Sequence, residues 1–349
     1  MKKLKLGVIF GGMSTENEVS CVSGVSVIKN LDKDKYDICP IYIDKNGKWF
    51  EVFNFEEKEQ TGEELEDKKI IDNVFEFLKS FDVIFPVLHG LYGEDGTIQG
   101  IFEMLKIPYV GCGVLASSIG MDKIYSKIIF DKIGLRQSKY VYLIKCKDYY
   151  IYNDNEFDEK ILGIDEVSNL ILDKLKFPLF VKPSNSGSSV GISKVCCKEE
   201  LKNAIFEASN FDKKVLIEQG IVGKEVECGV LGNEEVVTSC VGEVLPADLF
   251  YSYDAKYNNQ ESKVLIPADI SKDKSEEIRR LAVKAFKAID GKGLSRVDFF
   301  VEKDTEKVFI NEINTLPGFT SVSMYPMLFE SVGISYRDLL DRLVQLACN

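Results

Sequence analysis

Hydrophobic and polar residues follow one another along the chain with periods that predict strands and helices in alternation. Short apolar runs at residues 6–10, 36–42 and 83–88 indicate strands, and apolar residues at helical spacing run from Val19 to Leu31 between the first two. Strands and helices in this order are typical of a mostly parallel sheet covered by helices. The first third of the chain is therefore predicted to be an α/β domain.

The rest of the chain has the pattern of two further units. Helices are predicted from Met121 to Ile133 and at residues 164–175, and the acidic stretch 148–159 between them is predicted to be a surface excursion. Alternating residues at 294–301 and 307–313 predict an antiparallel hairpin. We therefore expect an α/β chain with α+β character in its C-terminal part, divided into domains at residues 1–113, 114–213 and 214–349.

The composition and charge of the chain exclude several classes of function. The chain has 349 residues, 45% of them hydrophobic, and a formal net charge of −12, which argues against nucleic acid or an anionic membrane as the main partner. The longest apolar runs are shorter than the roughly 18 residues of a membrane span. The nine cysteines are scattered without a CxxC pair, which favours reduced thiols. We expect a cytoplasmic protein.

The predicted hairpin carries the strongest chemical signal. Residues two apart on a strand share a face, so Arg296 and Asp298 point the same way, and Glu312 and Asn314 can join them from the partner strand. Two carboxylates and an amide oxygen are ligands that suit Mg²⁺ bound to phosphates, and an arginine adds a bidentate anion donor. Gly318, just beyond the hairpin, can bring a backbone N–H close to an oxyanion.

Three other segments add polar groups. His89, the single histidine, stands between a predicted strand and a Gly-rich loop, where ligands of open α/β sheets gather. Residues 182–191 form a Gly/Ser-rich loop with a lysine at its base, which can wrap polyphosphate although it is not a Walker A sequence. Residues 246–262 form an aromatic loop with Lys256 and Tyr257, predicted to be mobile and to close over an anionic substrate.

Together these segments resemble the signature blocks of the D-alanine–D-alanine ligases, a family that includes the ligases of glycopeptide resistance. The blocks follow the family's order over nearly the whole chain. They are Gly11 to Ser20, His89-Gly90 with Gly93 to Thr97, Met121-Asp122-Lys123, Lys182 to Gly191, Asp254 to Tyr257, Arg296-Val297-Asp298 and Glu312 to Gly318.

The resemblance implies an ATP-grasp fold with three α/β domains and ATP between the central and C-terminal domains. It implies that ATP phosphorylates the carboxylate of a first D-alanine and that the amine of a second amino acid displaces phosphate, for peptidoglycan synthesis. The implied cofactors are ATP and two Mg²⁺ ions, with Mn²⁺ as a substitute. The implied partners are D-alanine or D-serine and a second copy of the chain in a homodimer.

Family roles carry over to matching positions. The catalytic set is Glu16, Ser188, Tyr257, Arg296 and Gly318. The ATP contacts are Lys123, Lys182, Ser189, Glu218, Glu225 and Lys256, and the metal ligands are Asp298, Glu312 and Asn314. The substrate contacts are His89, Lys256, Ser323 and Met324. Among these, Glu16 matches the carboxylate that pairs with the first substrate's ammonium, and Ser188 and Tyr257 match its hydrogen-bonded partners.

Three positions depart from the family pattern or vary within it. Val322 stands where the family usually has histidine, so the task of that histidine must be done otherwise. Met324 stands where D-serine-adding relatives have arginine, which favours D-alanine as second substrate, with D-alanine–D-serine ligation as the alternative. Tyr257 stands where D-lactate-adding relatives differ, which argues against depsipeptide formation.

Three alternative functions are also considered from the sequence. An ATP-grasp ligase for other carboxylates conflicts with Glu16, His89 and the Tyr257 loop. A nucleotide sensor without chemistry conflicts with the complete set on the hairpin. A dinucleotide oxidoreductase is suggested by the N-terminal strand and glycines, but the chain lacks GxGxxG.

Overall fold

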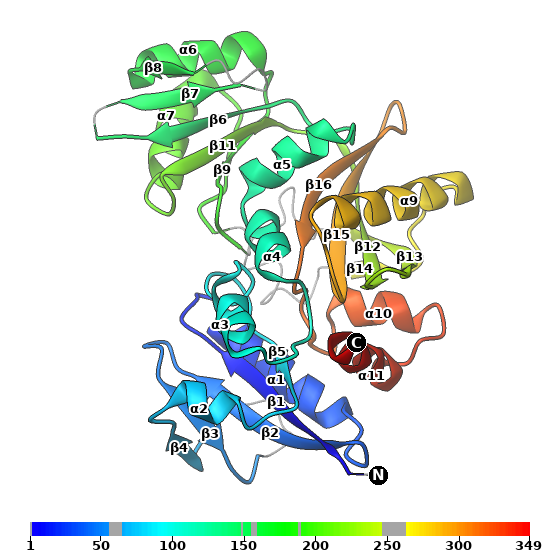
Figure 1. The fold of residues 1–349 in the computed structure, drawn as a ribbon. Helices are drawn as coiled ribbons and strands as arrows, with labels where there is room; N and C mark the ends of the chain where they lie inside the picture. Colours follow the sequence, from blue (N-terminus) through cyan, green and yellow to red (C-terminus); the bar gives the residue numbers. More distant parts are fainter. Residues whose placement is uncertain (1, 56–64, 148, 155–158, 188–189, 246–262) are drawn as a thin grey trace.

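The computed structural model describes residues 2–55, 65–147, 149–154, 159–187, 190–245 and 263–349. These residues are arranged around three β-sheets (Figure 1). The N-terminal sheet and the six-stranded central sheet lie at opposite ends of the view, and the C-terminal sheet lies between them to one side. In the described ranges, no helix combines the length and the apolar character needed to cross a membrane.

The N-terminal unit is a sheet with a parallel centre, as the sequence pattern predicted. Its strand order is β4-β3-β2-β1-β5, with β1 parallel to both β2 and β5 and with β3 and β4 antiparallel. Its elements are β1 (Leu4–Gly11), α1 (Asn17–Asn30), β2 (Tyr36–Ile43), β3 (Trp49–Val52), β4 (Lys68–Ile70), α2 (Val74–Leu78), β5 (Val83–Pro86) and α3 (Thr97–Leu105). The carboxyl ends of β1 and β5 therefore place Glu16 and His89 at one edge of the sheet.

The central unit is an antiparallel sheet with the order β10-β9-β11-β6-β7-β8. Its strands are β6 (Tyr140–Lys145), β7 (Tyr150–Asn153), β8 (Lys160–Leu162), β9 (Leu179–Pro183), β10 (Ser193–Val195) and β11 (Lys214–Gln219), with helices α6 (Ile164–Lys174) and α7 (Lys198–Ala208). The prediction of a surface excursion at 148–159 is wrong for its described part, because β7 lies there and buries Tyr150 and Tyr152. Aromatic residues at alternate positions outweighed the acidic composition.

The C-terminal unit is a second antiparallel sheet, with the order β14-β13-β12-β15-β16. Its elements are β12 (Gly223–Gly232), β13 (Val236–Leu245), β14 (Lys263–Leu265), α9 (Lys272–Ala288), β15 (Leu294–Glu302), β16 (Val308–Asn314), α10 (Met324–Glu330) and α11 (Tyr336–Cys348). The predicted hairpin is confirmed as β15 and β16. Helix α9 buries Ile278, Ala282 and Phe286 against one face of this sheet, and the opposite face carries the polar residues of the site.

Two helices, α4 (Val114–Met121) and α5 (Lys123–Lys132), connect the first unit to the central sheet. The helix predicted from Met121 to Ile133 is α5, which begins at Lys123 because Asp122 is its N-cap and accepts hydrogen bonds from the N–H groups of Ile124 and Tyr125. Residues 15–18 have the spacing of a capping box in the sequence, but no such box forms. Glu16 is the N-cap residue of α1, and its side chain makes no capping hydrogen bond.

Several elements pack against a different unit from the one in which the predicted domain boundaries place them. Strand β11 belongs to the central sheet, whereas Ala116 of α4 and Phe130 of α5 pack into the core of the C-terminal sheet. Helix α11 packs against the N-terminal sheet, with Leu343 in one cluster with Val8. We keep three domains as a proposal and place the second boundary between Gln219 and Gly223.

Candidate active site

A cavity of about 530 Å³ lies where the three units meet. It is lined by the loops after β1 and β5, the start of α5, strand β9, and one face of β12, β15 and β16. The described residues of the predicted site line this one cavity, except Asp298, which lies buried in the sheet face beneath it. Residues from both ends of the chain, such as Glu16 and Met324, are thereby brought together, as the family resemblance implied.

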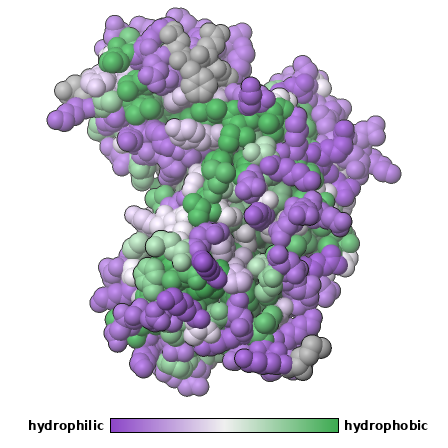
Figure 2. All heavy atoms as spheres, viewed as in Figure 1, coloured by the Kyte–Doolittle hydropathy of each residue, from purple (hydrophilic) through white to green (hydrophobic). Residues whose placement is uncertain are grey.

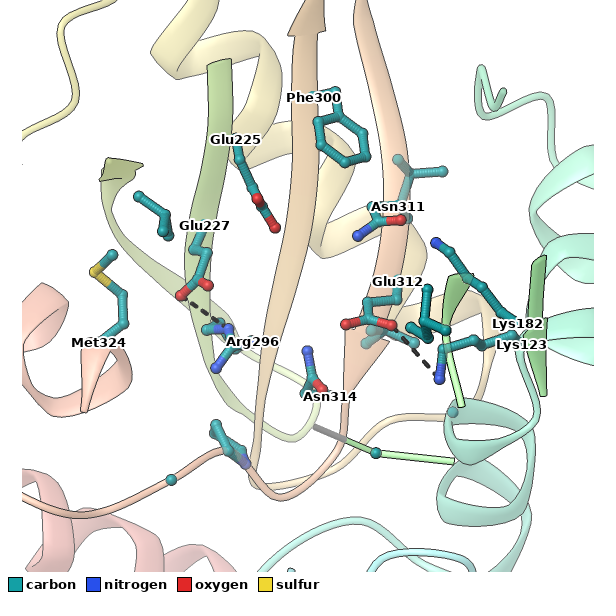
Figure 3. Close-up of a pocket in the computed structure, with 18 of the residues that line it drawn as sticks. Lys123, Lys182, Glu225, Glu227, Arg296, Phe300, Asn311, Glu312, Asn314 and Met324 are labelled. Carbon is teal, nitrogen blue, oxygen red and sulfur yellow. Dashed lines mark ion pairs between the residues drawn. The ribbon is translucent and has the colours of Figure 1, made fainter. Parts of the chain in front are cut away.

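The polar sheet face has a simple register. Glu227 of β12 lies opposite Asp298 of β15, and Asp298 lies opposite Glu312 of β16, so three carboxylates form one row across three strands. Arg296 and Asn314 form the next row. Opposed residues of neighbouring strands share a face. The close-up shows this face directed into the cavity (Figure 3).

Arg296 binds the carboxylates around it. Its Nε and Nη2 atoms donate to the two oxygens of Asp298, each at 2.7 Å, and Nε lies 2.9 Å from Oε2 of Glu227. Burial alone would lower the pKa of Arg296, but the charges of Asp298 and Glu227 raise it above its usual value. The guanidinium thus stays charged in a largely buried position, as an anion site requires.

Two residues of this face were missed by the sequence analysis. Glu227 is one, although the spacing Glu225-Val226-Glu227 on a strand puts both carboxylates on one face and could have identified it. Asn311 is the other. A register shift between Asp298 and Phe299 leaves Asn311 without a partner residue, so Asn311 and Glu312 both line the cavity although they are adjacent. A bulge of this kind leaves no signal in the hydrophobic pattern.

Lys123 stands opposite the sheet face. Its Nζ atom donates to the carbonyl of Ser186 at 2.6 Å and lies 3.7 Å from Oε2 of Glu312, the ion pair drawn in Figure 3. Asp122, the N-cap of α5, accepts a hydrogen bond from the hydroxyl of Ser184. The start of α5 and the Gly/Ser-rich loop are therefore held together, with one lysine pointing at a carboxylate of the sheet.

A second charged group lies in the central unit. Glu218 is 5% exposed and pairs with Lys182 of β9 and, at 2.9 Å, with Lys127 of α5. Burial alone would raise the pKa of Glu218, but the two lysines outweigh it and lower the pKa to about 2. Lys127 was missed, although its place four residues after Lys123 puts both lysines on one helix face.

Glu16 is enclosed by two glycine loops. A Cβ atom at Gly90 would lie 2.4 Å from Oε2 of Glu16, and one at Gly187 would lie 2.7 Å from the same oxygen. Gly90 also has a positive φ of 72°, which disfavours any side chain. The two loops come from different units, so their glycines make room for this buried carboxylate only in the assembled fold.

His89 and Glu94 lie beside Glu16. His89 is 6% exposed, and Glu94 accepts a hydrogen bond from the N–H of Gly90 at 2.9 Å. Burial, and after it the charge of Glu16, raises the pKa of Glu94 to about 8. Glu94 belongs to a block quoted for the family resemblance, but it was given no role, and it brings a carboxyl group with a raised pKa into the cavity.

The remaining predicted residues lie at the other end of the sheet face. Met324 is buried with Val244 and Leu328, and Ser323 accepts a hydrogen bond from the N–H of Thr320 at 2.9 Å. Val322, in place of the family's histidine, is 78% exposed. Gly318 and Glu225 also line the cavity. Ser188, Ser189, Lys256 and Tyr257 lie outside the described residues, with the rest of the loop 246–262.

The arrangement is suited to phosphoryl transfer to a carboxylate. It combines lysines and an arginine for phosphate oxygens with carboxylates for cations, and an enclosed carboxylate suits an ammonium group. Apolar Phe180, Ile221 and Phe300 line the same cavity, and Phe300 lies opposite Glu225 on the neighbouring strand, which suits a nucleotide base.

Comparisons with known proteins agree with this chemistry. Residues 5–112 match the family model of the D-ala D-ala ligase N-terminus, and residues 129–345 match that of the D-ala D-ala ligase C-terminus. A D-alanine–D-alanine ligase of Acetivibrio thermocellus is 50% identical over 99% of this chain and 96% of its own length. One from Clostridium novyi is 47% identical over 99% and 98%.

Solved structures show the same relationship. The crystal structure of VanG, a D-Ala:D-Ser ligase of Enterococcus faecalis, matches with a TM-score of 0.85 and 36% identity over 99% of this chain and 100% of that chain. The D-alanine–D-alanine ligase of Coxiella burnetii matches with a TM-score of 0.80 and 30% identity over 100% and 94%. The chain therefore belongs to the D-alanine–D-alanine ligase family, ATP-dependent ligases with the ATP-grasp fold.

Proposed function

We propose that this protein joins two molecules of D-alanine with consumption of ATP and supplies the dipeptide for peptidoglycan synthesis. One observation carries the proposal: a single cavity holds the enclosed Glu16 carboxylate at one end and the row of Glu227, Asp298 and Glu312 with Arg296 at the other. The first suits a substrate ammonium, and the second suits a phosphoryl group and its cations. An ATP-consuming reaction also fits the cytoplasmic location that the composition predicts.

The roles follow from the chemistry. The carboxylate of the first D-alanine attacks the γ-phosphorus of ATP, ADP leaves, and the amine of the second D-alanine then attacks the acyl carbon and displaces phosphate with loss of a proton. Negative charge develops in both steps next to Arg296, whose guanidinium is already oriented by Asp298 and Glu227. Gly318 is assigned as a backbone donor to the same charge. Lys123 and Lys182 are assigned to the phosphates of ATP, and Glu225 to its ribose.

Lys127 is assigned as the counter-ion of Glu218 when Lys182 contacts a phosphate of ATP. Lys182 pairs with Glu218, and a bound phosphate would compete with that carboxylate for its ammonium group. Glu218 would then keep Lys127 as its buried counter-ion, at 2.9 Å. A buried carboxylate without any partner would be costly. The second lysine thus lets Glu218 stay ionised for an adenine or ribose contact while Lys182 moves.

The proposed metal ligands are Asp298, Glu312 and Asn314. Among the described residues, no three His, Cys, Asp or Glu side chains converge as a metal cluster, and here the third member is an amide. Mg²⁺ in nucleotide sites takes one or two carboxylates together with phosphate oxygens, so this set fits. Asn314 directs Nδ2 at Asp298 over 3.0 Å and would have to present Oδ1 instead. When bound, Mg²⁺ or Mn²⁺ neutralises charge on the transferred phosphoryl group.

Phosphate release with a panel of D- and L-amino acids tests the proposal. We expect release with D-alanine, formation of the dipeptide, and no comparable release with L-amino acids. Release that needs another carboxylate, or ATP hydrolysis that no amino acid stimulates, would contradict the proposed substrate. The absence of any turnover with intact ATP binding would favour a nucleotide sensor.

D-alanine–D-serine ligation is the second candidate, favoured by the similarity to the D-Ala:D-Ser ligase VanG. The described surroundings of Met324 argue against it. Met324 is 7% exposed and packs against apolar neighbours, and one oxygen of the Glu243 carboxylate, Oε2, accepts from Nζ of Lys224 and the N–H of Asp269, each at 3.2 Å. Met324 itself offers no hydrogen-bond partner to a serine hydroxyl, and a site that does not bind this hydroxyl does not select for it.

A competition assay separates the two candidates. With equal D-alanine and D-serine, D-alanyl-D-alanine is expected to dominate, with D-alanyl-D-serine as a minor product resolved by mass. A pocket that hydrogen-bonds the serine hydroxyl can discriminate by roughly 10⁴. A dominant mixed product would therefore place this protein with the D-serine-adding ligases.

We also propose a homodimer. Hydrophobic residues gather on the surface over α4 and α5 (Figure 2), and large exposed side chains there and on the adjoining loop include Leu91, Tyr92, Val114, Leu115 and Tyr125. Contiguous exposed apolar surface of this kind marks interfaces. Sedimentation equilibrium should give twice the chain mass, and Leu115→Glu should shift it toward the monomer. A wild-type monomer at micromolar concentration contradicts this proposal.

A further inference from the structure

Ser23 of α1 connects two loops of the site through one hydroxyl group. Its Oγ atom lies 3.0 Å from Nε2 of His89, and the N–H of Phe319 donates to the same Oγ over 3.4 Å. Ser23 is fully buried, and neither the sequence blocks nor the roles proposed above include it. The hydroxyl therefore bridges the loop after β5 and the turn after β16, which come from different sheets.

The second contact of His89 completes this bridge. The carbonyl of Leu316 acts as a hydrogen-bond acceptor for the imidazole. Because Nε2 faces Ser23, we assign the contact with the Leu316 carbonyl to Nδ1, which makes Nδ1 the donor nitrogen. Burial lowers the pKa of His89 against the opposing charge of Glu16, which favours the neutral ring.

This tautomer gives each of the hydrogen bonds between Leu316, His89, Ser23 and Phe319 one donor and one acceptor. A neutral imidazole with its proton on Nδ1 has an acceptor at Nε2, so the Ser23 hydroxyl donates to His89. The lone pairs of Ser23 Oγ are left to accept from the N–H of Phe319. Each of these buried polar groups thus has a partner, and each partner depends on the next.

The turn held in this way carries Gly318. We call the connected residues Ser23 and His89 the relay. The relay holds the turn at the carbonyl of Leu316 and at the N–H of Phe319, on either side of Pro317 and Gly318. The hydroxyl of Tyr336 adds a bond to the carbonyl of Phe319 at 2.6 Å. The orientation of this turn is thus set by α1 and His89 of the N-terminal unit.

We propose that Ser23 is a positioning residue, which through His89 and the N–H of Phe319 fixes the turn that presents the Gly318 amide to the reacting carboxylate. The single histidine then belongs to the support of this turn. This inference rests on the proposed function, because it is that function which gives the Gly318 amide its task.

The expected effect of Ser23→Ala is on turnover. Loss of the hydroxyl frees the turn at two points, and a displaced oxyanion donor costs up to roughly 10²-fold in kcat. The groups assigned to ATP are not in contact with Ser23, so KM for ATP should stay within about twofold. Ser168→Ala is the matched control. Ser168 is also a buried helical serine, but its hydroxyl donates only to the carbonyl of Ile164 within its own helix, at 2.7 Å.

Nitrogen NMR of the lone histidine tests the relay without substrate, and needs a protein purified without a histidine tag. The wild-type imidazole should be the Nδ1–H tautomer at pH 7. Ser23→Ala should shift the Nε2 resonance and lower kcat about tenfold or more, and Ser168→Ala should change neither. A wild-type Nε2–H tautomer or imidazolium overturns the relay, and so does wild-type kcat in a folded Ser23→Ala protein.

A double variant shows whether Ser23 acts through His89. Ser23 acts both through His89 and through its own bond to the N–H of Phe319, so Ser23→Ala should slow His89→Ala by less than it slows the wild type. Effects that multiply overturn the inference. The wild-type NMR result is independent of any reaction and of the folding of a variant, so failure of the proposed function and failure of the relay remain distinguishable.

Discussion

Glu312→Gln is expected to fold as the wild type does and to lose turnover by about 10²–10³-fold, because metal neutralisation of a transferred phosphoryl group is worth several kcal/mol. The Glu312 side chain is a quarter exposed, and its ion pair with Lys123 is long, at 3.7 Å. Its removal should therefore change stability little. The variant should also need more Mg²⁺ for half-maximal activity, since one of two anionic ligands is lost.

Steady-state phosphate release over a Mg²⁺ titration measures both effects. Glu306→Gln is the matched control, because Glu306 is exposed in the turn of the same hairpin, away from the cavity. It should behave as wild type. Parental turnover and Mg²⁺ requirement in Glu312→Gln would show that this row of carboxylates does not hold the metal.

Arg296→Lys should lower kcat by about 10²–10³-fold, the usual effect of removing one oxyanion donor. A lysine keeps the positive charge that Asp298 and Glu227 require, so the buried carboxylates remain compensated and the fold is retained. It cannot keep the two parallel bonds to Asp298 while presenting a planar donor to the substrate. KM for ATP should change much less than kcat.

Arg280→Lys on the exposed face of α9 serves as the control for the same exchange of side chains. Thermal unfolding monitored by circular dichroism should show similar transitions for both variants. If Arg296→Lys turns over at the wild-type rate, a point charge is sufficient at this position, and the proposed oxyanion role of the guanidinium is wrong.

The local pattern of hydrophobic and polar residues was sufficient to predict many of the strands and helices of this protein. The parallel centre of the first sheet, the hairpin at residues 294–314 and the shared face of Arg296 and Asp298 follow from periods of two and 3.6 residues, which depend only on backbone geometry. The signature blocks indicated the family, which the comparisons confirm. They also contain Glu16, Lys123, Arg296 and Glu312, which line the cavity.

Contacts between distant segments were decided by the tertiary structure alone. The bulge that adds Asn311 to the site, the pairing of Lys127 with Glu218 and the bridge from Ser23 to His89 and Phe319 each join groups with no fixed relation in sequence. The sequence by itself thus determined which chemical groups are present and which share a strand or helix face. The packing of three sheets decided their partners and protonation, because burial and the distance between charges exist only in the folded chain.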